Sequence, residues 1–154
     1  MLFRSILSHY SAQYTAGGDE GIIDGLRGDV NWRKGGWQGY QGEDFEAIVD
    51  LGSGQTIHSL GAGFLQDVSP WILFPKKVEF SGSSDGKKFK RILTVPNIVP
   101  DTDMKAQVKD FSGEIAPEVF RYIKIKATTY GKLPAWHPGA GYDSHIFVDE
   151  ILVN

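Results

Sequence analysis

The chain has 154 residues, no cysteine and a formal net charge of −3. These values predict one domain, residues 1–154, with its own hydrophobic core, and they exclude disulfides, thiolate metal sites and a cysteine nucleophile. The acidic balance also argues against a nucleic-acid partner, because binding of phosphates needs a basic stripe. No apolar run reaches the roughly 20 residues that a membrane span requires.

The predicted elements are short strands separated by turns rich in Gly, Pro and Asp. In residues 45–51 every second side chain is apolar, which is typical of a strand that buries one face. Residues 77–96 read as two strands joined by a turn at residues 84–86. Residues 119–126 place Val119, Ile123 and Ile125 on one face, and residues 145–153 form the last strand. This series favours an all-β sandwich or jelly roll.

Three long connections interrupt the strands, at residues 19–44, 65–75 and 128–144. Loops of this length in a compact domain are usually functional or disordered. Disordered loops avoid tryptophan, so we expect these three to be ordered. They carry all four tryptophans of the chain, which are Trp32, Trp37, Trp71 and Trp136.

An ordered set of short motifs carries a family resemblance. The set consists of IIDGLRGDVNW, FEAIVDLGSGQTIHSLGAGFLQD, VEFSGSSDGKKFKRI, FRYIKIKA and FVDEILV. In this order the motifs resemble the discoidin or coagulation factor 5/8 type C domains, which include galactose-binding-like carbohydrate-binding modules. The finer pattern YSAQYTAGGDEGIIDGLRG, followed late in the chain by AWHPGAG, is similar to the C-terminal module of bacterial chitobiase-type β-hexosaminidases.

The resemblance implies a galactose-binding domain-like jelly roll of about eight antiparallel strands, with long loops at one end. It also implies a non-catalytic module that tethers a β-N-acetylhexosaminidase to a glycan containing galactose or N-acetylhexosamine. The chain is then the excised C-terminal part of a secreted, periplasmic or cell-surface glycosidase, whose catalytic domain is its partner in cis.

The resemblance further implies a structural Ca²⁺ held by carbonyls, an aspartate and a late glutamate. Asp24 and Glu150 match those two acids, and hard oxygen ligands suit calcium. The family loop reads D-G-N-x-x-T-x-W, whereas this chain is two residues longer and lacks the threonine. Asp29 or Asn31 is the expected substitute.

A second interpretation of the same acids needs no metal. Asp24 then makes only an Asx turn, and Glu150 pairs with a basic residue such as Arg27 or Arg121.

Catalysis is not expected from this chain. It contains none of the common nucleophile, zinc-protease or phosphate-loop motifs, and its neighbouring acids on strands point to opposite faces. His137 would need an orienting partner to act as a base. His137, Asp143 and His145 lack a recognised spacing for a transition metal.

Sugar binding needs an exposed aromatic platform and a few planar polar groups, which loops at one end of a sandwich can gather. Trp37 and Trp136 are the preferred platforms, while Trp32 is assigned a structural role. Two alternatives stay open: an adhesion surface for protein or membrane, which has few nearby cations for anionic lipid, and a domain that only buttresses its neighbour. The expected sugar contacts are Trp37, Tyr40, Gln66, Asp67, Trp71, Trp136, His137 and Tyr142.

Overall fold

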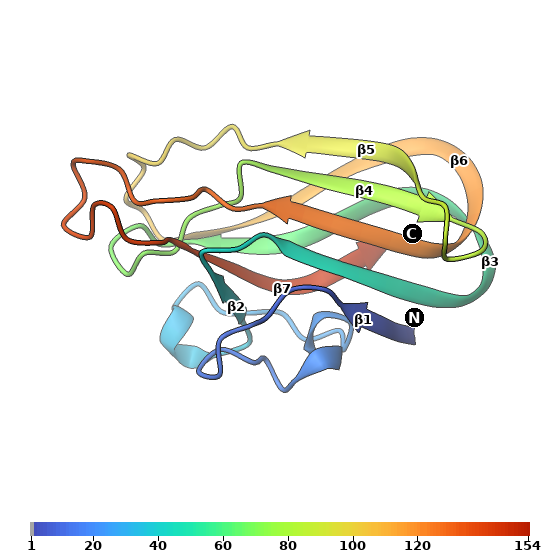
Figure 1. Ribbon diagram of the computed structural model, residues 1–154, viewed down its shortest axis with the longest axis horizontal. Coiled ribbons are helices and arrows are strands. Elements are labelled where there is room, and N and C mark those ends of the chain that lie inside the picture. The colour runs from blue at the N-terminus through green and yellow to red at the C-terminus, as the bar shows by residue number, and fades with distance from the viewer. Residues whose placement is uncertain (1) are drawn as a thin grey trace.

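The computed structural model describes residues 2–154 of the chain. Seven strands and two short 3₁₀ helices account for its regular structure (Figure 1). None of the helices among these residues has the length and hydrophobicity to cross a bilayer. In chain order the elements are β1 (Leu2–Ile6), η1 (Asp19–Ile22), η2 (Trp32–Lys34), β2 (Gln38–Gln41), β3 (Phe45–Gln66), β4 (Lys77–Ser83), β5 (Lys90–Pro96), β6 (Gln107–Thr128) and β7 (His145–Val153).

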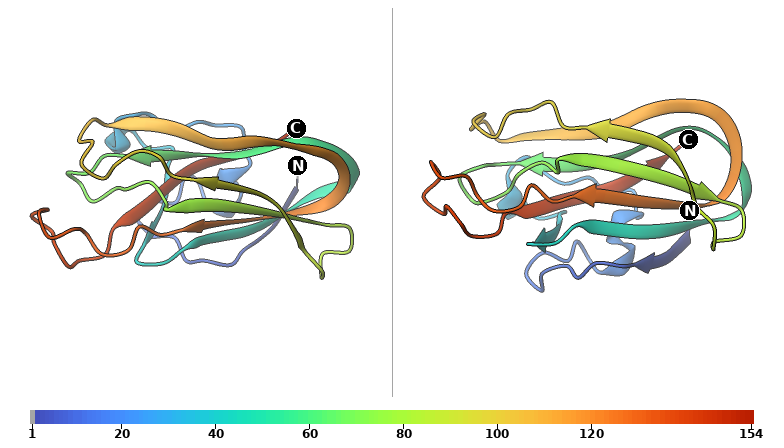
Figure 2. Two further views of the ribbon diagram at one scale, coloured as in Figure 1. Left: turned by 90° about the horizontal axis from the view of Figure 1, so that it is seen from above. Right: turned by 45° about the horizontal axis from the view of Figure 1, so that its top comes forward.

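Two long strands, β3 and β6, build both layers of the fold. Residues 45–50 of β3 pair with residues 122–127 of β6, and residues 55–66 pair with residues 107–120. The first part of the ribbon lies between β1 and the β4–β5 pair, and the second part borders β7 and β2. Figures 1 and 2 show the ribbon curving over at the end opposite the long loops.

The predicted all-β antiparallel sandwich is therefore confirmed. It has seven strands instead of about eight because β3 and β6 each continue from one layer into the other, where the sequence suggests separate short strands.

The bend of the ribbon follows from the sequence at residues 51–54. Gly52 has a φ of 87°, a value that costs a glycine little, and its N–H donates to Asp50 Oδ1 at 2.8 Å. The bend also changes which side chains face inward. Val119 is 58% exposed, contrary to the predicted face, while its neighbour Phe120 is buried.

The core lies between the two layers. Phe45, Ala47 and Val49 of β3 are buried, as their alternation predicts. They pack together with Ile123 and Ile125 of the neighbouring strand β6 in one cluster. Each large apolar side chain buried in this way contributes about 1.5–3 kcal/mol. The core fixes the ribbon and therefore the positions from which the loops depart.

The long loops are ordered by hydrogen bonds to one another. His145 N–H donates to Trp71 O at 2.8 Å, and Leu73 N–H donates to His145 O at 3.1 Å. Leu133 N–H donates to Tyr142 O at 2.8 Å within the last loop. The loops before β4 and before β7 therefore form one connected surface at the end of the sandwich.

Candidate functional site

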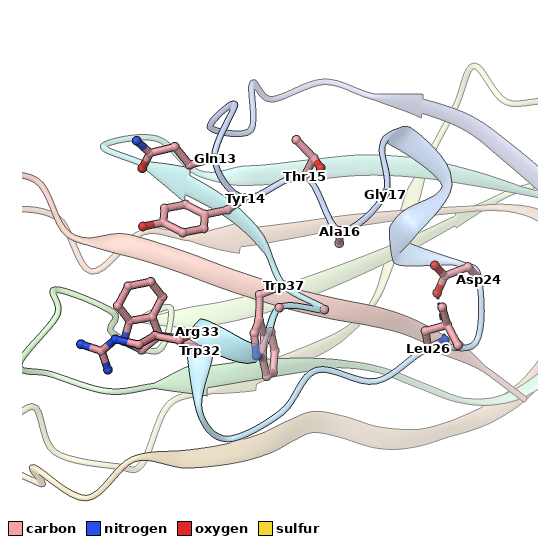
Figure 3. A pocket seen from close by; sticks show the side chains of 12 residues that line it. Gln13, Tyr14, Thr15, Ala16, Gly17, Asp24, Leu26, Trp32, Arg33 and Trp37 are labelled. Atoms are coloured by element: carbon pink, nitrogen blue, oxygen red, sulfur yellow. Dashed lines mark hydrogen bonds between the residues drawn. The ribbon is translucent and has the colours of Figure 1, made fainter.

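A groove with a volume of about 550 Å³ lies between residues 13–17 and residues 24–37 (Figure 3). Tyr14 and Trp32 stand at one end of this N-terminal groove, and Asp24 and Leu26 stand at the other. Its volume lies within the range of about 300–1,000 Å³ that is typical of small-molecule sites.

One wall of the groove is attached to β2. Gly39 N–H donates to Tyr14 O at 2.9 Å, and Ser11 N–H donates to Gly39 O at 2.7 Å. A Cβ at Gly39 would lie 2.9 Å from Tyr14 Cβ, so the glycine permits this close approach. The phenol ring of Tyr14 is thereby held against Phe147 of β7, at 4.8 Å between ring centroids.

The opposite wall is the short helix η2. Asn31 Oδ1 accepts from Arg33 N–H at 3.1 Å and caps the first turn. Gly35 and Gly36, both at a φ of 84°, then reverse the chain toward β2. The cap and the chain reversal together bring the Trp32 ring against the Tyr14 ring, with ring centroids 6.0 Å apart and planes at 81°.

Arg33 gives the aromatic end of the groove its polar group. Its guanidinium lies 4.7 Å from the Trp32 ring centroid, a cation–π contact. Across residues 2–154 its side chain forms no ion pair within 4 Å, so its N–H donors are available to a ligand. An indole, a phenol and a free guanidinium therefore meet at one place.

A second hollow adjoins the groove on the other side of Trp32. Its volume is about 360 Å³, and Trp32, Arg33, Asp67, Ser69 and Pro70 line it. Burial raises the pKa of the half-buried Asp67 carboxyl, and the Arg33 charge opposes this shift. The carboxylate and the guanidinium therefore belong to one electrostatic environment.

The aromatic residues of the last loop lie apart from the groove lining. Trp71 stacks on Tyr142, with centroids 5.5 Å apart and planes at 21°. Tyr142 is 65% exposed and Trp136 is 49% exposed. Trp136 and Tyr142 of the last loop are thus exposed to solvent, while Trp71 of the loop before β4 is partly buried.

His137 is a structural residue of that loop. It is buried, its Nε2 lies 2.7 Å from Val68 O, and its Nδ1 accepts from Gly139 N–H at 2.9 Å. Since Nδ1 is an acceptor, Nε2 carries the proton and donates to Val68 O. The predicted sugar-contact role of His137 is wrong, because both nitrogens serve the loop itself.

The burial of three other residues also contradicts their predicted sugar contacts. Trp37 is 2% exposed, its Nε1 donates to Asp29 O at 2.7 Å, and its ring lies against Gly28. Tyr40 lies in the core. Gln66 is buried and its amide donates to Pro100 O at 3.2 Å. All three complete the packing beneath the loops. Trp37 also lines the N-terminal groove, but at 2% exposure it offers no ring face on which a sugar could stack.

Tyr14 and Arg33 were not predicted from the sequence, and Trp32 was assigned only a structural role. The available signal was a Trp-Arg pair next to an Asn N-cap and a Gly-Gly reversal. Tyr14 has no local signal, because a hydrogen bond to distant Gly39 brings it into the groove.

The predicted metal loop brings Asp24 and Glu150 together. Glu150 Oε2 accepts from Gly25 N–H at 2.7 Å, while its Oε1 is buried and has no hydrogen-bond partner among the described residues. Burial raises the Glu150 pKa to about 7, and the charges of Asp24 and Asp149 add to the shift. A buried carboxylate oxygen without a partner is costly, and a hard cation such as Ca²⁺ is one group that would satisfy it.

Asp29 and Asn31 use their side chains elsewhere. Asp29 Oδ1 accepts from Asn31 N–H at 2.8 Å, and Asn31 caps η2. Asp24 Oδ1 accepts from Leu26 N–H at 2.8 Å, the predicted Asx turn. In the part of the chain that the structure describes, no three carboxylate or imidazole side chains converge as metal ligands.

The basic residues suggested as partners of Glu150 pair with other acids. Arg27 Nε lies 2.9 Å from Asp149 Oδ2 and its Nη2 lies 2.5 Å from Asp110 Oδ1, while Arg121 pairs with Asp50. The ion-pair interpretation of Glu150 is therefore wrong.

The chain resembles several solved carbohydrate-binding modules. A CBM32 of AlyQ in complex with 4,5-unsaturated mannuronic acid has a TM-score of 0.55 at 15% identity, covering 100% of this chain and 98% of that chain. A CBM32 from Clostridium perfringens in complex with GalNAc-β-1,3-galactose has a TM-score of 0.58 at 17% identity, covering 97% and 91%. Chitosan-binding module 1 of a chitosanase/glucanase from Paenibacillus sp. IK-5 has a TM-score of 0.55 at 15% identity, covering 97% and 92%.

At these identities the likeness shows a shared fold. A comparison with curated proteins gave no match. The family model of the F5/8 type C domain matches residues 7–145, which is most of the chain. The chain therefore belongs to the F5/8 type C domain family.

Proposed function

We propose that this chain is a carbohydrate-binding module and that it binds glycan in the N-terminal groove. The observation that carries the proposal is the meeting of Tyr14, Trp32 and Arg33 at one end of that groove. The solved modules that share its fold bind mannuronic acid, GalNAc-β-1,3-galactose and chitosan, which supports a sugar ligand.

The groups of the groove match the chemistry of a sugar. The C–H face of a pyranose stacks on an aromatic ring for about 1 kcal/mol, and each hydrogen bond adds a net of about 1 kcal/mol. One stack and a few hydrogen bonds give roughly 3–5 kcal/mol, or a Kd of roughly 0.2–6 mM. Such weak binding is useful to a tethered module, since attachment raises the effective concentration on a polymer.

Calorimetric titration with galactose, N-acetylgalactosamine, N-acetylglucosamine and chito-oligosaccharides tests the proposal. Trp32→Ala should weaken binding about tenfold, because it removes the stacking surface and leaves Arg33 unsupported. The matched control is Trp136→Ala, which removes an exposed tryptophan outside the groove and should leave the affinity unchanged. Equal affinities for wild type and Trp32→Ala would place the site elsewhere.

We also propose the chitobiase-type β-N-acetylhexosaminidase as the enzyme that this module tethers, in a secreted, periplasmic or surface protein. The sequence pattern around residues 10–28 and 135–141 supports this context. Joined to such a catalytic domain, the wild-type module should retain the enzyme on insoluble chitin, and Trp32→Ala should release it. Retention that is unaffected by the substitution would contradict the tethering role.

For the metal loop we propose a structural Ca²⁺, with Asp24 and Glu150 as the side chains that hold it. The unpartnered Glu150 Oε1 supports this proposal. A cation that binds only the native state stabilises it by about 2.7 kcal/mol at 100 times its Kd, which raises the Tm by roughly 5–10 °C at this size. Thermal unfolding in EGTA and in excess Ca²⁺ measures this difference.

Glu150→Gln is the control for the calcium proposal. It should abolish the difference between EGTA and Ca²⁺, because it removes the charged ligand while keeping the side chain's shape. A wild-type Tm that is the same in both conditions would end the proposal.

A further inference from the structure

We infer that the N-terminal groove and the adjoining hollow are consecutive subsites, so that the ligand is a glycan chain of two or more sugar units. This inference rests on the proposed function and names the ligand class of the same site. Its basis is that both cavities are lined by Trp32 and Arg33, which form the boundary between them.

The boundary can serve a ligand on both sides. The central carbon of the Arg33 guanidinium lies over the indole ring, at 4.7 Å from its centroid. Among residues 5–154 the guanidinium forms no ion pair, so its N–H donors are available to a ligand. The N–H donors of a guanidinium at this position can form hydrogen bonds to oxygens of two adjacent sugar units.

The second hollow offers the complementary groups. Asp67 presents a half-buried carboxylate and Ser69 an exposed hydroxyl, next to the apolar ring of Pro70. Within residues 2–154 the Asp67 carboxylate accepts no hydrogen bond from the protein, although its backbone pairs with Ile72. An unsatisfied, half-buried acceptor favours ligands rich in hydroxyl donors.

The test compares sugars of increasing length by calorimetry. The probes are N-acetylglucosamine, its β-1,4-linked dimer and trimer, and the matched series galactose and β-1,4-galactobiose. The inference predicts that the dimer of the recognised sugar binds about tenfold tighter than the monomer. The Asp67→Ala/Ser69→Ala double variant should lose this gain.

Ser53→Ala, on the exposed bend at the other end of the molecule, is the control and should keep the gain. Equal affinity for monomer and dimer, or a gain that survives in the double variant, would overturn the inference while leaving the proposed function intact. If no probe binds, the proposed function falls and the inference falls with it.

Discussion

His145, which lies beside Tyr14, shows how burial sets the pKa of a single residue. Its ring lies edge-on to Tyr14 and Phe147, with centroids 5.9 and 5.8 Å away, and its buried Nδ1 has no partner among the described residues. Burial lowers the His145 pKa below its ordinary value of 6.5. At pH values just below 6.5 the unfolded chain therefore protonates this ring, whereas in the folded protein the ring stays neutral.

The sign of the resulting pH dependence follows from proton binding. Below pH 6.5 the unfolded state binds the additional proton, so the contribution of His145 to stability is present at pH 7 and is lost as the pH falls. Urea unfolding at pH 7 and pH 5 should show a larger loss of free energy for wild type than for His145→Gln. Identical losses in the two proteins would refute this assignment, since His9 and His58 are exposed in both.

The residue scale is also where prediction from sequence was weakest. Trp37 and Trp32 both follow glycine or polar residues in one loop, yet Trp37 is buried, while Trp32 packs against the same cluster and is only partly buried. Trp37 immediately precedes β2, so the strand carries its ring inward beside Gly28. Trp32 lies on a capped turn that projects from the sheet. Only the three-dimensional path of the loop distinguishes the positions of these two tryptophans.

At the scale of elements, Arg27 clamps the loop of residues 24–31 to the sandwich. It bonds to Asp149 of β7 and to Asp110 of β6, and Gly28 N–H donates to Asp149 Oδ2 at 3.0 Å. Gly63 of β3 lies beneath this clamp, and a Cβ there would lie 2.1 Å from Asp149 Oδ1. The glycine therefore lets a loop cross the outer face of the sheet.

Removal of the clamp should destabilise the protein. Arg27→Ala leaves the fully buried Asp149 carboxylate without its cation, which costs about 3 kcal/mol. Lys90→Ala is the matched control, because its pair with Glu118 is solvent-exposed and contributes less than about 1 kcal/mol. Denaturant unfolding measures both, and an equal cost for the two variants would contradict the clamp.

Elements were predicted better than single residues. The alternation in residues 45–51 and the turn at residues 84–86 depend on local chemistry, and both were confirmed. The continuity of β3 and β6 through the bend was not predicted, because glycines at 52 and 54 usually indicate the end of a strand.

At the scale of the whole molecule, the ordered motifs were sufficient to predict the sandwich and the family. They could not predict the groove, because its walls come from residues 13–17 and 24–37, which meet only after both have packed on β2 and β7. The central claim is therefore the position of the site, with Trp32 and not Trp136 as the sugar platform.

The indole N–H signals in an ¹⁵N–¹H NMR titration test that claim most directly, since the chain has only four tryptophans. On addition of millimolar glycan, the account predicts that the Trp32 signal shifts most and that the Trp71 and Trp136 signals stay in place. A glycan that shifts Trp136 and leaves Trp32 unchanged would contradict the account.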